Sequence, residues 1–168
     1  MSFVEEMIEA KIAKPKTPSV KFCVMEGRQA KSPVRAHFDD AGIDIFAPLD
    51  MEEVTIQPNE AYLVNTGLKC ICPKGYAMFV MNKSGVAVKK CLDHGAEVID
   101  EGYRGEIGIH LINVGKEAQT IKPGDKIIQV VLLPVGYHMV EMVSEDEYSR
   151  MGETSRGAGA YGSTGNVL

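Results

Sequence analysis

Short apolar runs recur along most of the chain, and glycine, proline and asparagine separate them. Runs of this length that are rich in β-branched residues and bounded by turn residues are typical of β-strands. Their even spacing predicts an all-β fold, a jelly-roll-like barrel or sandwich. We expect strands at Val20–Met25, Ile43–Phe46, Val54–Ile56, Ala61–Val64, Leu68–Ile71, Tyr76–Met81, Ile107–Ile112 and Ile127–Leu133.

Two of these strands are apolar on both of their faces. Val80 is followed directly by Met81, and residues 127–132 are apolar except for Gln129. Runs of this kind are typical of strands that are covered on both sides. We therefore expect one side of these strands to pack inside the barrel and the other side to pack against another subunit.

The order of these patterns divides the chain into three parts. Residues 1–19 form an N-terminal extension, whose apolar residues repeat at helical spacing before Pro15 and predict one short helix. Residues 20–148 form the β-barrel domain. Residues 149–168, which are rich in glycine, form a flexible C-terminal arm.

Composition limits the classes of function that remain. The chain has 168 residues and a formal net charge of −5, so it offers no basic field for general nucleic-acid binding. Its longest apolar stretch is too short to span a bilayer, and its acidic start does not resemble a signal peptide. We expect a soluble, cytoplasmic protein with no nucleic-acid or membrane partner, whose four cysteines are reduced thiols.

Two short cysteine motifs raise the question of a zinc site. These motifs are Cys70-x-Cys72 and Cys91-x-x-His94. We expect Cys70 and Cys72 to point to opposite faces of their strand, and the spacing is not that of a zinc finger. The cysteines are therefore interpreted as buried thiols, and no metal held by protein ligands is predicted.

Polar clusters near the ends of strands carry part of the candidate chemistry. Lys83 and Ser84 follow the strand that ends at Met81, and a cation with a hydroxyl in such a place can bind phosphate. Gln129 interrupts an apolar strand, and its amide needs partners, of which a phosphate oxygen is one. The alternatives are an exposed turn for the first cluster and a structural hydrogen bond to the backbone for Gln129.

Asp100 is the candidate general base. It follows Val98 and Ile99, which would fix its position and partly desolvate it, and a carboxylate so placed can take a proton from water. Tyr103, three residues further on, would form the floor of a sugar pocket. The alternative is a solvated aspartate in an ordinary turn.

The segment from Arg156 to Gly165 has no apolar periodicity. Its glycine N–H groups and the fork of Arg156 suit phosphate oxygens, and Tyr161 offers a face on which a base can stack. Such a segment can become ordered on a ligand that supplies the missing contacts, which suggests a lid over a nucleotide. The alternative is a solvated terminus.

Taken in order, these segments resemble the five sequence motifs of the homotrimeric deoxyuridine triphosphatases (dUTPases). The resemblance covers roughly residues 20–168. The motifs correspond to residues 41–45, 83–87, 95–105, 124–129 and 156–165. The resemblance implies a dUTPase-like fold, a homotrimer whose active sites are shared between chains, and hydrolysis of dUTP to dUMP and pyrophosphate.

The resemblance also implies roles for single residues. Asp100 would activate the water that attacks the α-phosphorus, and Asp44 would support the site through local hydrogen bonds. Mg²⁺ would be held by the triphosphate and by water. Tyr103 would lie against deoxyribose, and Tyr161 would stack on uracil. Substrate contacts are expected from Lys83, Ser84, Gly85, His94, Val98, Tyr103, Gly108, Gln129, Arg156, Tyr161, Gly162, Ser163 and Thr164.

Three residues depart from the usual pattern of this family in ways that bear on substrate geometry. Lys83 stands where most members have arginine, Glu97 replaces a common glycine in the uracil hairpin, and Ala160 replaces a glycine of the tail. At position 83, lysine keeps the charge but loses the bidentate fork of arginine.

Two other functions remain open. The first is a dCTP deaminase, which has the same fold but a catalytic glutamate where this chain has His110. An imidazole is a different proton carrier from a carboxylate, which argues against deamination. The second is a non-catalytic trimer that binds dUTP and acts as a regulatory protein, and the intact Asp100 argues against it.

Overall fold

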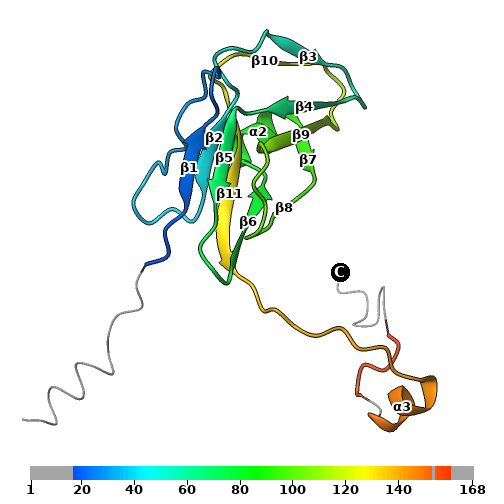
Figure 1. The fold of residues 1–168 in the computed structure, drawn as a ribbon. Coiled ribbons are helices and arrows are strands. Elements are labelled where there is room, and N and C mark those ends of the chain that lie inside the picture. The colour runs from blue at the N-terminus through cyan, green and yellow to red at the C-terminus, as the bar shows by residue number, and fades with distance from the viewer. Residues whose placement is uncertain (1–16, 153, 160–168) are drawn as a thin grey trace, which may run out of the picture. The chain divides into compact units, whose positions relative to one another are not determined.

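The computed structural model describes residues 17–152 and 154–159, which are built mainly from strands and their connections (Figure 1). The chain falls into two compact units, one up to Gly136 and one from Tyr137 onward. The strands all belong to the first unit, which confirms the predicted all-β class.

Within its described residues, the first unit forms eleven strands and one short helix. In chain order they are β1 (Lys21–Val24), β2 (Ile43–Phe46), β3 (Val54–Ile56), β4 (Ala61–Asn65), β5 (Leu68–Ile71), β6 (Tyr76–Met81), α2 (Ser84–Lys90), β7 (Leu92–Gly95), β8 (Val98–Ile99), β9 (Gly108–Asn113), β10 (Gln119–Ile121) and β11 (Lys126–Pro134). The strands pair antiparallel in four sheets, with the orders β1–β5, β10–β3, β2–β11–β6–β8 and β4–β9–β7.

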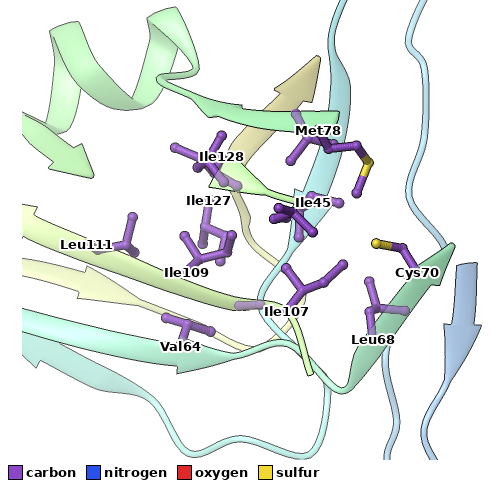
Figure 2. Close-up of a cluster of buried hydrophobic side chains, with 14 of the residues drawn as sticks. Ile45, Val64, Leu68, Cys70, Met78, Ile107, Ile109, Leu111, Ile127 and Ile128 are labelled. Atoms are coloured by element: carbon purple, nitrogen blue, oxygen red, sulfur yellow. The ribbon is translucent and has the colours of Figure 1, made fainter. Parts of the chain in front are cut away.

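One hydrophobic core fills the first unit, and both larger sheets contribute side chains to it (Figure 2). Ile45, Met78 and Ile128 come from the four-stranded sheet, and Ile109 and Leu111 come from the three-stranded sheet. Each of these five side chains is at most 1% exposed. Burying one side chain of this size contributes roughly 1.5–3 kcal/mol, so this core is the main support of the sheets that carry the polar clusters.

All eight strands expected from the sequence are present, with ends that agree to within one residue. Three further strands, β7, β8 and β10, lack the pattern on which that expectation rests. β8 has only two residues. β7 places Asp93 and His94 on a half-buried strand, so tertiary pairing with β9 outweighs local strand preference there.

Two short helices also lack a hydrophobic signal in the sequence. α2 begins at Ser84, where the sequence indicates only a loop or turn, and it has no buried residue. In the second unit, α3 (Glu145–Arg150) begins after Ser144, whose hydroxyl accepts a hydrogen bond from Glu147 N at 3.2 Å. This spacing is that of a capping box, by which α3 was predictable. The expected N-terminal helix lies outside the described residues, and none of the described helices has the length and apolar character that a membrane crossing requires.

A β-bulge explains the doubly apolar character of β11. The register between β11 and β2 shifts between Lys126 and Ile128, and a bulge lets neighbouring residues depart from strict alternation. Ile127 and Ile128 are accordingly both 1% exposed within one chain. Met81 and Leu133 remain 38% exposed, and their cover by another subunit stays a prediction.

The expected geometry of the cysteines is wrong in two respects. Cys70 and Cys72 are both buried, because residues two apart on a strand share a face rather than pointing to opposite ones. Burial, aided by the neighbouring Cys72, raises the pKa of the Cys70 thiol to about 12. Cys91 is exposed rather than buried. In the described ranges, no group of three or more His, Cys, Asp or Glu side chains is placed to hold a metal.

Candidate active site

Three charged side chains meet beside the edge strand β2 of the four-stranded sheet. β11 lies between β2 and β6, and its Gln129 pairs with Asp44 on one side and Met81 on the other. This pairing brings the residues after β6 close to β2. Lys83 Nζ donates a hydrogen bond to Asp44 Oδ1 at 2.8 Å, and Lys126 Nζ lies 2.8 Å from Asp44 Oδ2. One carboxylate is thus bracketed by two ammonium groups.

A polar hollow of about 280 Å³ opens beside this cluster. It is lined by Ala36, Asp40, Ala41, Gly42, Asp44, Lys83, Gln129 and Val131. Asp44 is 4% exposed, whereas the side chains of Lys83 and Lys126 are 30% and 43% exposed, so the positive charge faces solvent. Exposed ammonium groups above a buried carboxylate suit an anionic ligand such as a phosphate. We call this the phosphate-side hollow.

Gln129 makes the backbone hydrogen bond that was the structural alternative for it. Its Nε2 donates to Asn82 O at 2.9 Å, which ties β11 to the residue before Lys83. Its Oε1 lies so close to Gly42 that a Cβ added at position 42 would overlap with it. Gln129 therefore holds the loop that carries Lys83 and also lines the phosphate-side hollow.

Two opposing effects set the pKa of Asp44. Burial favours the neutral acid and would raise the pKa, but the ammonium groups of Lys126 and Lys83 favour the carboxylate and hold the pKa below its usual value. Asp44 is therefore ionised at neutral pH. Its hydrogen bond to Lys83 Nζ restrains the position of that ammonium group.

We expect Asp44→Asn to lower the free energy of unfolding by about 1–3 kcal/mol at pH 7, because a neutral amide no longer pairs with two cations. The folded-state pKa lies below the unfolded-state value, so this contribution is present above the unfolded value near 4 and is lost as the pH falls through the folded value. Urea unfolding should therefore show the difference between wild type and variant shrinking between about pH 5 and pH 3. An equal difference at pH 7 and pH 3 would show that the charge of Asp44 plays no part.

A second hollow of about 150 Å³ lies at the turn after β8. It is lined by Val80, Ala96, Val98, Ile99, Asp100, Tyr103, Glu106, Ile107 and Gly108. Four of the residues that the sequence predicts for the site meet here: Val98, Asp100, Tyr103 and Gly108. Apolar walls with one aromatic ring and the polar residues Asp100 and Glu106 suit a sugar or a base. We call this the nucleoside-side hollow.

Asp100 lies exposed at the rim of this hollow. Its backbone oxygen accepts a hydrogen bond from Tyr103 N at 3.1 Å, which closes the turn. The expectation that Val98 and Ile99 both shield Asp100 is wrong for the single chain, because strand side chains alternate and Val98 is 53% exposed while Ile99 is 8% exposed. The carboxylate is therefore placed where it meets water directly.

Tyr103 stands as a wall of the same hollow. Its hydroxyl donates a hydrogen bond to Glu106 O at 2.8 Å. A Cβ added at Gly105 would overlap with the Tyr103 hydroxyl, so the ring can lie in this position only because residue 105 has no side chain. The ring is 45% exposed and offers a free face.

His94 links the hairpin beside the nucleoside-side hollow to the loop of the phosphate-side hollow. Its Nδ1 lies 3.0 Å from Asn82 Oδ1, and Asn82 Nδ2 donates to Asp93 Oδ1 at 2.7 Å. Its Nε2 is buried without a hydrogen-bond partner among the described residues and lies 4.0 Å from Glu97 Oε1. His94 itself does not line either of the two hollows, so the structure does not bring it together with Tyr103.

The remaining predicted site residues lie apart from the two hollows or outside the described residues. Ser84 and Gly85 form the start of α2, directly after Lys83. Arg156 belongs to the second unit, where its Nε donates to Gly159 O at 3.0 Å. Outside the described residues lie Tyr161, Gly162, Ser163 and Thr164.

Three residues touch the site although the sequence alone assigns them no role. Lys126 lies in the segment 124–129, where its charge beside a strand was an available signal. Asp93 and Glu106 are charged residues in segments of ordinary composition, and only the fold shows that they contact Asn82 and the turn of Tyr103.

Comparison with known proteins gives consistent matches. The family model described as dUTPase matches residues 28–165. The chain is 43% identical over 139 residues to the deoxyuridine 5′-triphosphate nucleotidohydrolase of Clostridium novyi, covering 79% of this chain and 89% of that protein. It is 39% identical over 147 residues to the Mus musculus protein of the same name, covering 88% of this chain and 85% of that protein.

Solved structures give the same result for the fold. A mutant dUTPase of Staphylococcus bacteriophage 80alpha, solved with dUpNHpp, superposes with a TM-score of 0.76 at 26% identity and covers 88% of this chain and 99% of that chain. A mutant dUTPase from phage phi11 of S. aureus, whose structure concerns the coordination of a structural Mg(II) ion, gives a TM-score of 0.67 at 26% identity and covers 77% of this chain and 99% of that chain.

Proposed function

The chain belongs to the dUTPase family, and we infer from this that it hydrolyses dUTP to dUMP and pyrophosphate. It is a nucleotide hydrolase. The observation that carries the proposal is the presence, in one fold, of a polar hollow lined by Asp44 and Lys83 and a second hollow with Asp100 at its rim. The deaminase alternative is not favoured, because the curated relatives reported above are nucleotidohydrolases.

The phosphate-side hollow binds the triphosphate in this proposal. Lys83 supplies charge, and Ser84 and Gly85 supply hydroxyl and backbone donors directly after it. Asp44 holds the Lys83 ammonium group in place through the 2.8 Å contact. The amide of Gln129 fixes the loop and faces the same hollow. Phosphoryl transfer needs positioning and charge stabilisation more than covalent chemistry, and this set of groups supplies both.

The nucleoside-side hollow binds the deoxyuridine part. Asp100 takes the proton of the water that attacks the α-phosphorus. Tyr103 lies against the deoxyribose and leaves no room for a 2′-hydroxyl, while Val98 and Gly108 form the walls. His94 acts with the hairpin at residues 94–98, whose backbone reads the uracil. A thymine methyl would clash there, and a cytosine amino group would leave groups unpaired.

The C-terminal arm, residues 149–168, completes the site in this proposal and is separate from the enzyme domain at residues 20–148. Arg156, Gly162, Ser163 and Thr164 contact the phosphates. Tyr161 stacks on the uracil. The residues from Tyr137 onward form a compact unit of their own, which contains this arm together with residues 137–148.

Mg²⁺ binds in this proposal through the phosphates of the substrate and through water. Both carboxylate oxygens of Asp44 already face ammonium groups, so this residue is not free to be a direct ligand of the metal. That arrangement fits a metal carried in by the triphosphate. When bound, Mg²⁺ supplies charge neutralisation along the phosphates.

A homotrimer with shared active sites is the proposed assembly. The two hollows of one chain have no lining residue in common, so a single chain presents the two halves of a nucleotide site as separate places. Exposed Met81 and Leu133 on neighbouring strands also need cover. A second copy that places its nucleoside-side hollow beside the phosphate-side hollow would meet both needs. Free cysteines such as Cys23 suit a reducing compartment, and we place the protein in the cytoplasm.

A nucleotide panel tests the proposed function. We expect Mg²⁺-dependent release of pyrophosphate from dUTP, with kcat/KM for dTTP, dCTP and UTP lower by roughly 100-fold or more, because each carries a group that clashes or leaves polar groups unpaired. Pyrophosphate and ammonia are both measured. Ammonia release from dCTP would point to the deaminase, and tight binding of dUTP without pyrophosphate release would point to the regulatory trimer.

A further inference from the structure

Arg28, in the connection between β1 and β2, binds three segments that are far apart in the sequence. Its Nε donates to Asp50 Oδ2 at 2.7 Å, its Nη1 donates to Glu106 Oε1 at 2.8 Å, and its Nη2 donates to Asn65 O at 3.0 Å. The planar guanidinium is the only common side chain that can hold three such acceptors in a fixed geometry. These three hydrogen bonds restrict the rotation of the Arg28 head group.

Glu106 connects this anchor to the nucleoside-side hollow. Its Oε1 accepts hydrogen bonds from Arg28 and, at 2.7 Å, from Gly67 N. Its backbone oxygen accepts the hydrogen bond of the Tyr103 hydroxyl at 2.8 Å. Glu106 also lines the hollow itself. The side chain of Glu106 is thus fixed from outside the hollow, while its backbone fixes the ring inside.

Tyr103 depends on this connection for its orientation. The ring is 45% exposed, so core packing does not set its position. The hydrogen bond to Glu106 O and the close approach to Gly105 are the contacts that hold its hydroxyl in the described structure. A displacement of Glu106 would therefore be passed on to the tip of the Tyr103 ring.

We propose that Arg28 is a positioning residue for sugar discrimination: by anchoring Glu106 it fixes the Tyr103 ring against the sugar, and it thereby sets the preference for a deoxyribonucleotide over a ribonucleotide. This inference rests on the proposed function, in which Tyr103 lies against the deoxyribose. The Tyr103 ring can exclude a 2′-hydroxyl only if the ring stays in place, because a small displacement of the ring opens the needed space. Arg28 restrains the ring from outside the nucleoside-side hollow, through Glu106.

The test compares two variants. One removes all three hydrogen bonds of the Arg28 head group, and the other alters only one of them. Arg28→Met keeps most of the stem packing but removes every donor. Asp50→Asn removes the charge of one acceptor and leaves the bonds to Glu106 and Asn65 in place. For each protein, kcat/KM is measured with dUTP and with UTP, and Tm is measured without ligand.

We expect Arg28→Met to lower the ratio of kcat/KM for dUTP to that for UTP by about tenfold, because the ring then yields to the 2′-hydroxyl. Asp50→Asn should leave this ratio at the wild-type value even where its Tm falls. Arg28→Lys, which reaches only one acceptor at a time, should give an intermediate ratio, and it replaces Arg28→Met if that variant does not fold. A folded Arg28 variant with the wild-type ratio, or equal changes in ratio for the Asp50 and Arg28 variants, would overturn the proposal.

The outcome is separable from that of the proposed function. A wild-type protein that does not hydrolyse dUTP would refute the function itself. A wild-type protein that hydrolyses dUTP, together with Arg28 variants of unchanged ratio, would refute only the role of Arg28.

Discussion

Replacement of Asp100 by asparagine is expected to lower the turnover of dUTP by about 10²–10⁴-fold while dUTP binding is retained. The amide has the shape of the carboxylate but cannot accept a proton from the attacking water. Asp100 lies exposed at the rim of the nucleoside-side hollow, where the substitution leaves the core untouched. Turnover is measured as pyrophosphate release, and binding is measured by calorimetry with a non-hydrolysable analogue.

A matched control is Glu53→Gln, which removes a carboxylate that is paired only on the surface, 3.4 Å from Lys122. This variant should keep wild-type turnover, because exposed ion pairs contribute little. If Asp100→Asn also keeps near wild-type turnover, the general base lies elsewhere. If it loses binding as well, the carboxylate positions the substrate rather than the water.

Deletion of the chain from Met151 onward is expected to lower turnover by at least about 100-fold, since positioned contacts to phosphates and base are lost together. The Tm should change little. The buried core of the described residues, with the side chains packed against it, ends at Leu132, so the deleted part supplies none of it. Unfolding of the truncated protein would show that the arm is structural. Full turnover would show that it is a solvated terminus without a role.

Substitutions of Tyr161 test the contribution of base stacking by the arm. Tyr161→Ala removes a stacking face that is worth about 1–3 kcal/mol per base and should weaken binding of the substrate accordingly. Tyr161→Phe keeps that face and should be nearly silent. A large effect of the phenylalanine variant would show that the hydroxyl, and not the ring, makes the contact.

Mixing the two defective proteins tests whether the sites are shared. In a trimer whose site takes Asp100 from one chain and the arm from another, exchange of subunits places intact parts together and restores part of the activity. The Asp100→Asn protein and the protein truncated at Met151 are therefore incubated together under conditions that allow their subunits to exchange. Activity that stays at the sum of the two separate proteins would mean that each chain completes its own site.

The strands were predictable because their signal is local. β9 alternates between buried and half-buried residues along its whole length. Ile109, His110 and Leu111 show this period of two in the sequence, whereas the buried Asn113 does not. β7 and β8 are held by their neighbours instead. Leu92 to Gly95 pair with β9, and Val98 and Ile99 pair with β6, so their structure depends on partners that the local sequence does not show.

The sequence predicts the residues of the candidate site only where they lie in a recognisable motif. Asp44 and Lys83 were each found from the sequence, but their 2.8 Å hydrogen bond joins residues 39 positions apart and needed the order of strands in the sheet. The bond between Arg28 and Glu106 spans 78 positions. Neither residue lies in a motif that carries a role by itself, because a supporting side chain is defined by what it holds.

The contact between Gly42 and Gln129 limits how this protein can change in descent. Any codon change that gives residue 42 a side chain brings a Cβ onto the Gln129 oxygen, and a shorter residue at 129 gives up the hydrogen bond to Asn82. A side chain at residue 42 is accommodated only if Gln129 moves or is replaced, and either event disturbs the loop before Lys83. We therefore expect each position to restrict substitutions at the other, although the two lie 87 positions apart in the sequence.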